Sequence, residues 1–104
     1  MLRKKIKHNR IKPKVFKNKA YLSYMHNSGK TCLVCGSCNI ELHHVKTKTL
    51  TDRADNRVVP LCPEHHRGKF SPHGFDSIDF YEEYSKEFLL DEARKFYDEY
   101  ILSS

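Results

Sequence analysis

The four cysteines and four of the seven histidines of this 104-residue chain lie between Cys32 and His66. Cys32 and Cys35 form a C-x-x-C pair, and Cys62 and His65 form a second pair with the same spacing. Residues i and i+3 lie on the same face of a helix, so the side chains of the second pair can converge. Tetrahedral zinc in proteins takes four such ligands in two pairs. This pattern predicts a structural zinc site made of Cys32, Cys35, Cys62 and His65.

A bound metal would matter for the stability of a chain of this size. Its length allows one domain, and such a domain buries only about 60–68% of its unfolded surface. An apolar core alone would be marginal, and a structural metal would add the missing stability. The spacing and the neighbouring histidines favour metal binding over two disulfides, which indicates a reducing compartment. Cys38 fits neither pair and is left out of the shell.

The distribution of charge divides the chain into a basic front and an acidic rear. The net charge is +6, yet no Asp or Glu occurs before Glu41. After Pro72 the chain contains nine Asp and Glu residues but three Lys and Arg residues. This asymmetry indicates that one face meets a polyanion. Residues 1–19 are either a solvated tail or a basic arm that contacts phosphates, and such arms often order only on binding.

The sequence predicts a cytoplasmic protein. Residues 1–10 are charged and no apolar run follows them, so we expect no signal peptide. No stretch approaches the roughly 20 apolar residues that a membrane span needs.

Hydrophobic periodicity predicts an α+β domain over residues 20–104. A weak helix is expected over 20–28, where Tyr21, Leu22 and Met25 share a face. Strand-like runs cover 39–45 and 57–61, with a polar loop between them, and a short helix follows over 63–69. Residues 76–101 are expected to form one long amphipathic helix that covers the core.

Three further histidines predict a second site. His66 follows His65 directly and would point about 100° away from it on a helix, so the two rings should serve different ions. In a hairpin with the helix packed across it, His66 would come near His43 and His44. Three histidines there would hold a divalent ion and leave one imidazole free as a base. A regular strand points His43 and His44 to opposite sides, so the strand must end or twist sharply there.

These motifs resemble the HNH endonucleases, which have the ββα-metal fold. The runs C-x-x-C-G, E-L-H-H-V and D-N-R-V-V-P-L-C-x-x-H-H occur in that order between Cys32 and about Lys69, a third of the chain. The segment FSPHGFDSIDFYEEY is more weakly similar to phage recombination-enhancement nucleases with HNH domains. The resemblance implies a zinc-containing domain with a helix on either side, encoded by a bacterium or a phage.

The resemblance also implies a role for each matching residue. His43 and His66 would hold a catalytic divalent ion, which could be Mg²⁺, Mn²⁺ or another transition metal. His44 would be the general base. Asn56 would fix the loop and orient that base or, as in some members of the family, reach the metal. A backbone carbonyl across the loop is expected to orient the His44 ring. His65 stands where many relatives carry a cysteine, and three cysteines with one histidine remain an ordinary zinc shell.

The expected reaction is metal-dependent hydrolysis of phosphodiester bonds in nucleic acid, with DNA as the expected substrate. His73 is a third metal ligand, a phosphate contact or a turn histidine. Four positive side chains flank the site and could clamp phosphates as a group: Arg53, Arg57, Arg67 and Lys69. Lys46 and Lys48 lie in the same loop region. Two other interpretations are a non-catalytic zinc-finger module that binds nucleic acid and a protein–protein adaptor built on the aromatic helix. Strand specificity, oligomeric state and the need for a protein partner stay open.

Overall fold

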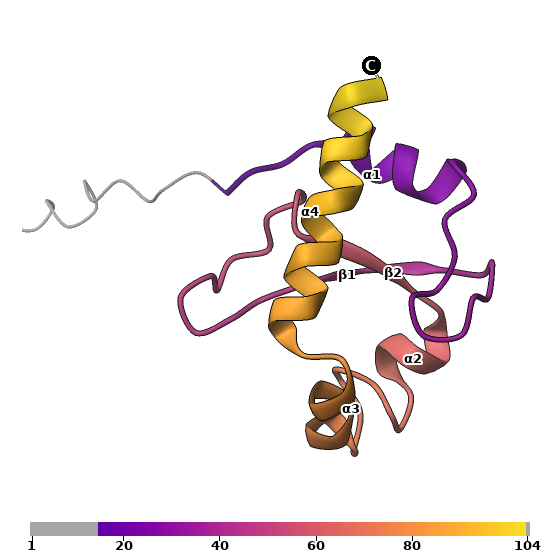
Figure 1. Ribbon diagram of the computed structural model, residues 1–104, viewed down its shortest axis with the longest axis vertical. Coiled ribbons are helices and arrows are strands. Elements are labelled where there is room, and N and C mark those ends of the chain that lie inside the picture. The colour runs from indigo at the N-terminus through magenta and orange to yellow at the C-terminus, as the bar shows by residue number, and fades with distance from the viewer. Residues whose placement is uncertain (1–14, 104) are drawn as a thin grey trace, which may run out of the picture.

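The computed structural model describes residues 15–103 of the chain. Within that range the elements follow in the order α1 (Lys19–Asn27), β1 (Glu41–His44), β2 (Val58–Leu61), α2 (Pro63–Arg67), α3 (Ser77–Glu83) and α4 (Lys86–Ser103) (Figure 1). The predicted α+β class is confirmed, with a two-stranded antiparallel sheet at the centre. Most of the basic arm predicted over residues 1–19 lies outside the described residues.

Strands β1 and β2 form a hairpin whose two edges differ. His43 lies opposite Val59 and His44 lies opposite Val58 in the antiparallel register. On the far edge of β2, the carbonyl of Pro60 accepts a hydrogen bond from the backbone of Leu33 at 3.0 Å. Within the described residues β2 is the one strand that pairs with β1. The other edge of β1 therefore has no strand beside it.

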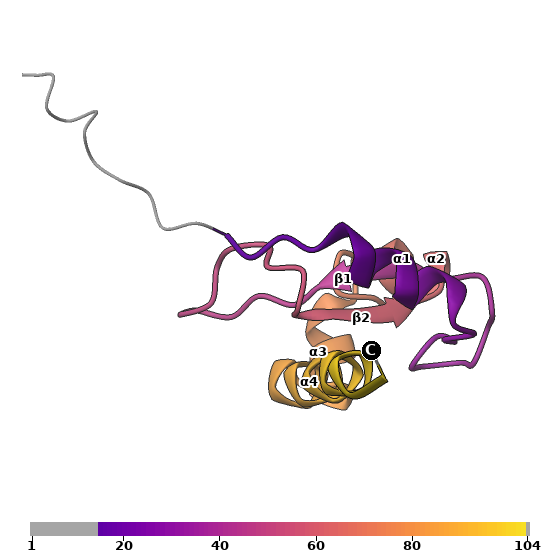
Figure 2. The same ribbon diagram turned by 90° about the horizontal axis from the view of Figure 1, so that it is seen from above.

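The hairpin lies between two helical layers. Figure 2 shows α1 on one side of the sheet and α3 and α4 on the other. The side that faces α3 and α4 buries an apolar cluster that includes Val59, Leu61, Phe80 and Leu89. A second cluster centres on the fully buried Tyr21 of α1, which also packs against aromatic rings near the end of α4. No helix in the described part of the chain is long and apolar enough to cross a membrane.

Helix α1 begins at a side-chain cap and lies within one residue of its predicted range. The Asn18 side chain accepts a hydrogen bond from the backbone N–H of Tyr21 at 3.0 Å. Such a cap satisfies one of the N–H groups that the first helical turn leaves without a partner. The strands and α2 are shorter than predicted, because residues 39–40, 45, 57 and 68–69 lie outside the regular elements.

The prediction of one helix over residues 76–101 is wrong. The chain instead forms α3 and α4, which are separated by Tyr84 and Ser85. Tyr84 leaves the helical conformation with φ −123° and ψ 85°, and the Ser85 hydroxyl accepts the backbone N–H of Phe88 at 3.1 Å. A serine that caps a new helix competes with helix continuation, although the apolar spacing runs on through the break.

Candidate metal centres

Three thiols and one imidazole meet at the point predicted from the paired spacing. The candidate ligand atoms of Cys32, Cys35, Cys62 and His65 all lie within 4.8 Å of one another. His65 Nδ1 lies 3.2 Å from the sulfur of Cys62 and 3.9 Å from that of Cys32. All four cysteines of the chain are free thiols. This cluster could hold a metal ion, and its donor set is one that zinc commonly takes.

Local backbone geometry brings the two pairs together. Gly36 has φ 78°, and its N–H donates to the carbonyl of Cys32 at 2.9 Å, so the turn closes as expected from the sequence. Cys62 is the residue before α2, with Pro63 at the first helical position. Cys62 and His65 are therefore three residues apart at the start of a helix and present their ligand atoms on one side.

The backbone around Cys32 also favours the thiolate that a metal requires. Burial opposes ionisation of this thiol, but hydrogen bonds from the backbone of Cys62, Cys35 and Val34 outweigh that effect and lower its pKa to about 7. The N–H of Val34 lies 3.3 Å from the sulfur. Cys38 is exposed and takes no part in the cluster.

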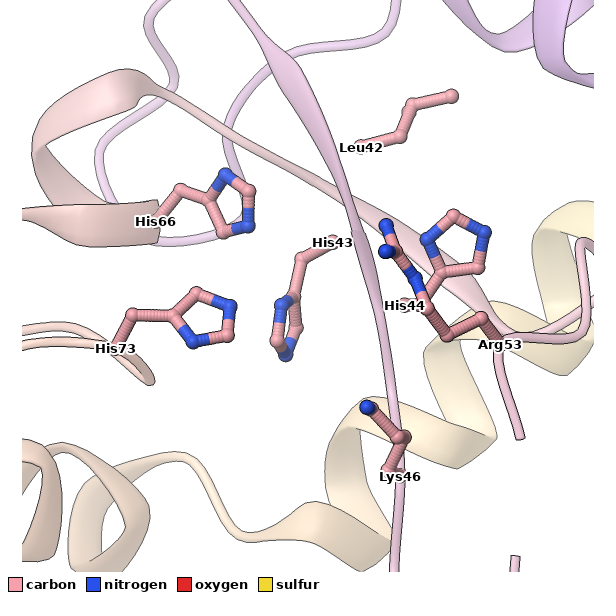
Figure 3. Close-up of a pocket in the computed structure, with 7 residues that line it drawn as sticks. All are labelled: Leu42, His43, His44, Lys46, Arg53, His66 and His73. Carbon is pink, nitrogen blue, oxygen red and sulfur yellow. The ribbon is translucent and has the colours of Figure 1, made fainter. Parts of the chain in front are cut away.

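Three histidines form a second cluster. The candidate ligand atoms of His43, His66 and His73 lie within 4.8 Å of one another, and their ring centroids are 5.1–5.2 Å apart. His43 comes from β1, His66 from α2 and His73 from the loop that precedes α3. Figure 3 shows the three rings facing one another. Of the three roles left open for His73, the structure thus places it with the two predicted ligands.

Burial keeps this cluster in the state that binds cations. His43 is only 4% exposed, and burial, followed by the charges of His66 and His73, lowers its pKa to about 3. Burial, followed by the charges of His66, Lys46 and Arg53, also lowers the pKa of His73. At neutral pH these two imidazoles are therefore neutral, which is the form that a metal ion binds.

A carboxylate that the sequence analysis did not single out supports the cluster. Glu41 Oε1 lies 2.8 Å from His66 Nδ1, and Arg67 donates to Glu41 Oε2 at 2.7 Å. The hydrogen bonds from Arg67 and then His66 lower the pKa of Glu41 to about 2, so it is ionised. An ionised partner on Nδ1 leaves Nε2 of His66 free to bind a cation. Strand alternation is the signal for this role, because Glu41 lies two residues before His43 and so on the same face.

His44 points away from the three-ring cluster. Figure 3 shows it on the other side of the β1 ribbon, next to the side chain of Arg53. The sharp twist that would bring His43 and His44 to one side is not present, although β1 does end at His44. The orienting partner also differs from the expected backbone carbonyl. His44 Nε2 lies 3.0 Å from Oδ1 of Asp55, a second carboxylate that the sequence analysis did not single out.

Both histidines of the pair nevertheless border one cavity. It has a volume of about 220 Å³ and is lined by Leu42, His43, His44, Lys46, Arg53, His66 and His73. Residues from both faces of β1 reach it because it lies at the end of the strand, where His44 is the last residue. The cavity combines the three clustered imidazoles with two permanent cations. That combination suits an anionic ligand together with a metal ion.

Asn56 and most of the predicted phosphate contacts lie elsewhere. Asn56 and Arg57 line a different cavity of about 200 Å³ next to α4, and Asn56 Oδ1 is buried with no hydrogen-bond partner within the described residues. Arg57 is bonded to Asp52, Arg67 is bonded to Glu41, and Lys69 lies 3.8 Å from Asp76. Of the four predicted phosphate contacts, the structure brings only Arg53 to the histidine cavity. Lys46, from the same polar loop, joins it there.

Comparisons with protein-family models, with curated proteins and with solved structures find no match for this chain.

Proposed function

We propose that this chain is a metal-dependent endonuclease of the HNH type, encoded by a bacterium or a phage and active in the cytoplasm. It hydrolyses phosphodiester bonds of nucleic acid, with DNA as the expected substrate. The observation that carries the proposal is one cavity that combines a three-histidine cluster, a separate histidine and two cations. Zinc in the cluster of Cys32, Cys35, Cys62 and His65 stabilises the fold.

The donor atoms of the second cluster favour particular ions. Three imidazole nitrogens suit transition metals such as Ni²⁺ or Zn²⁺, whereas Mg²⁺ and Mn²⁺ prefer oxygen ligands. His43, His66 and His73 would hold the ion. When bound, such an ion supplies positive charge that stabilises the charge developing on the scissile phosphate and on the leaving oxygen.

The remaining residues of the cavity perform the other steps. Arg53 and Lys46 attract the anionic backbone of the substrate and hold one phosphate in the cavity. His44 then accepts a proton from the attacking water, since an imidazole can be neutral at the working pH. Its Nδ1 is buried and has no hydrogen-bond partner within the described residues, so neighbouring side chains must shift to let the attacking water reach it. A positioned base of this kind typically contributes about 10²–10⁴ in rate.

Cleavage of plasmid DNA tests the proposal. Zinc-loaded protein supplied with Mn²⁺ or Ni²⁺ should nick supercoiled plasmid, and His44→Ala should reduce the rate by about 100-fold or more. His26→Ala is the matched control, because His26 is an exposed histidine at the end of α1 and outside both clusters. Equal rates for wild type and His44→Ala would end the assignment of His44 as the base.

A second candidate function is a zinc-stabilised module that binds nucleic acid without cutting it. It is favoured by the position of Asn56, which lies in a different cavity from the histidines and so departs from the arrangement that the resemblance implies. The two functions differ in metal content. The nuclease should bind one tight zinc and one weaker ion per chain, whereas the binding module should bind only the zinc and show salt-dependent affinity without cleavage.

A further inference from the structure

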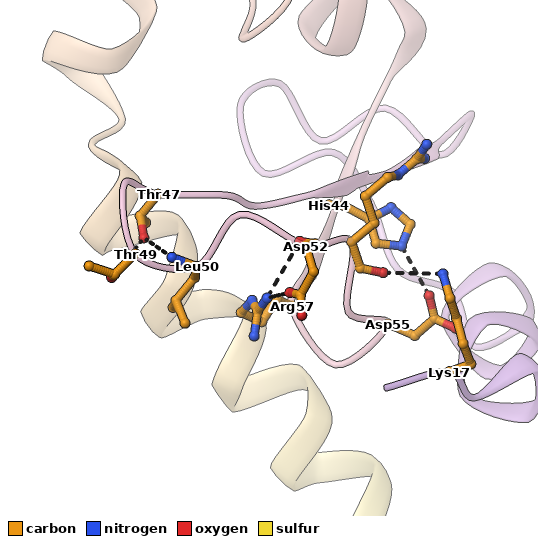
Figure 4. Close-up of polar contacts among 9 residues, drawn as sticks. Lys17, His44, Thr47, Thr49, Leu50, Asp52, Asp55 and Arg57 are labelled. Carbon is orange, nitrogen blue, oxygen red and sulfur yellow. Dashed lines mark hydrogen bonds and ion pairs between the residues drawn. The ribbon is translucent and has the colours of Figure 1, made fainter. Parts of the chain in front are cut away.

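The carboxylate of Asp55 is buried between His44 and the start of α1. Asp55 is 4% exposed, and its Oδ1 lies 3.0 Å from His44 Nε2 (Figure 4). Its Oδ2 accepts the backbone N–H of Asn18 at 2.8 Å, and its own N–H donates to the carbonyl of Phe16 at 3.0 Å. Each carboxylate oxygen thus has one partner, and the backbone holds the residue in place.

These partners determine where the proton of a neutral His44 sits. Burial raises the pKa of Asp55, but hydrogen bonds from the Asn18 backbone and His44 and the charge of Lys17 outweigh it, so the pKa falls below its usual range. An ionised carboxylate can only accept hydrogen bonds. Nε2 of His44 must therefore carry the hydrogen, and Nδ1 must carry the free lone pair. Nδ1 is the buried nitrogen that has no partner within the described residues.

We propose that Asp55 is the positioning residue for the base, holding the His44 ring in one orientation and in the tautomer whose Nδ1 accepts the proton. The inference rests on the proposed nuclease function. It assigns the orientation of the His44 ring to the Asp55 side chain rather than to a backbone carbonyl. Asp55 touches neither the three-histidine cluster nor the substrate cavity. It acts through His44, in the same way that a carboxylate orients the imidazole base of other hydrolases.

Asp55→Asn is the informative variant because the backbone constrains it. The N–H of Asn18 can only donate, so the new side chain must turn its carbonyl oxygen toward Asn18. Its NH₂ group then faces His44 Nε2, which must become an acceptor, and the ring proton moves to Nδ1. Asp52→Asn is the matched control. It makes the same change in charge in the same loop, at a carboxylate that pairs with Arg57 and not with His44.

Two measurements test the inference, and the first needs no activity. Long-range ¹H–¹⁵N spectra of the zinc-loaded protein at neutral pH give the tautomer of each ring, and His44→Ala identifies the signals of His44. We expect hydrogen on Nε2 in wild type and in Asp52→Asn, and on Nδ1 in Asp55→Asn. A wild-type ring with hydrogen on Nδ1 would overturn the inference, whether or not the variants fold.

The second measurement is plasmid cleavage with bound metal counted in the same samples. Asp55→Asn should lose about 100-fold or more in rate with unchanged metal content, and Asp52→Asn should stay near wild type. Equal rates for these two variants would overturn the role of Asp55 while leaving the nuclease function intact. Absence of cleavage by wild type would instead overturn the nuclease function, and the ring spectra would still decide the tautomer separately.

Discussion

His65 and His66 are consecutive residues of α2, but their rings contact different clusters. His65 Nδ1 lies 3.2 Å from the sulfur of Cys62, whereas His66 Nδ1 lies 2.8 Å from Glu41 and its ring is 5.2 Å from that of His43. Successive side chains on a helix point about 100° apart, so one short helix supplies a ligand to each cluster. Because α2 spans only Pro63–Arg67, the position of the second cluster depends on the integrity of the first.

Cys62→Ser should unfold the domain. A structural zinc site contributes on the order of 10 kcal/mol, which is comparable to the whole stability of a small domain. We expect the variant to lose the bound zinc and the cooperative thermal transition. The transition is monitored by circular dichroism. Cys38→Ser is the matched control, since Cys38 is exposed and outside the cluster, and it should melt like wild type. A cooperative melt of Cys62→Ser with no zinc bound would refute the coupling of metal and fold.

Glu41→Gln should weaken the binding of a divalent ion by the three-histidine cluster without unfolding the protein. The change keeps the size of the side chain but removes the charge that makes the His66 imidazole a better ligand. Loss of such a supporting partner typically lowers metal affinity by about 10–100-fold. Titration calorimetry of the zinc-loaded protein with Mn²⁺ or Ni²⁺ measures this affinity. Arg67→Gln removes the other partner of Glu41 and should not weaken binding. Equal affinities for both variants would remove Glu41 from the site.

His43 should make the stability of the protein fall with acid. The pKa of His43 is lowered to about 3 in the folded protein, whereas an unfolded histidine titrates near 6.5. Between these pH values the unfolded chain binds a proton that the folded chain does not. The contribution of His43 is therefore complete above about pH 6.5 and is lost progressively toward pH 3, with a slope of up to about 1.4 kcal/mol per pH unit.

The variant His43→Phe isolates this contribution. It keeps an aromatic ring in the buried position but cannot take up a proton. The free energy of unfolding of both proteins is measured by denaturant titration from pH 7 to pH 5, with one zinc bound and no other divalent ion. As the pH falls, the free energy of unfolding of the wild type should decrease more steeply than that of His43→Phe, by about 1 kcal/mol per pH unit. Parallel curves would mean that His43 is not held neutral by burial.

Elements set by local spacing were predictable from the sequence. The paired Cys and His motifs and the turn at Gly36 depend on spacings of a few residues, and the structure brings the pairs together and forms the turn. The two strands were predictable from their apolar runs, and they pair across the loop of residues 45–57. The division between α3 and α4 was not predictable from periodicity, because the apolar pattern continues through Ser85. At that point Tyr84 leaves the helical conformation and the Ser85 hydroxyl caps the new helix.

Contacts between distant segments could not be predicted in the same way. Asp55 meets Asn18 across a separation of 37 residues, and no local motif joins them. Asn56 was expected beside the histidines, but it lines the cavity next to α4 and lies in a turn in which the N–H of Arg57 donates to the carbonyl of Ala54 at 3.1 Å. The partners of His44 and the separation of Asn56 are decided by how the loop of residues 45–57 folds back on α1 and α4.

Removal of residues 1–14 should reduce the salt dependence of binding to DNA. These residues hold seven of the nineteen Lys and Arg side chains. The segment that follows them is fixed beside the cavity, since Lys17 donates to the carbonyl of Arg53 at 3.4 Å and Phe16 accepts from Asp55. An arm that starts there can reach the phosphates next to a substrate held in the cavity. Each phosphate contact contributes about 0.9 to the slope of log affinity against log salt.

Binding of the His44→Ala variant to duplex DNA at a series of salt concentrations measures this slope without cleavage. We expect the truncation to lower the slope by several units, up to about 6 if every base of the arm contacts a phosphate. Lys95→Gln is the control, because Lys95 pairs with Glu92 on the acidic helix α4 and should leave the slope unchanged. If the truncated protein kept the full slope, the basic front would be a solvated tail. The cations that attract DNA would then have to lie in the folded domain, and Arg53 and Lys46 would be the first to replace.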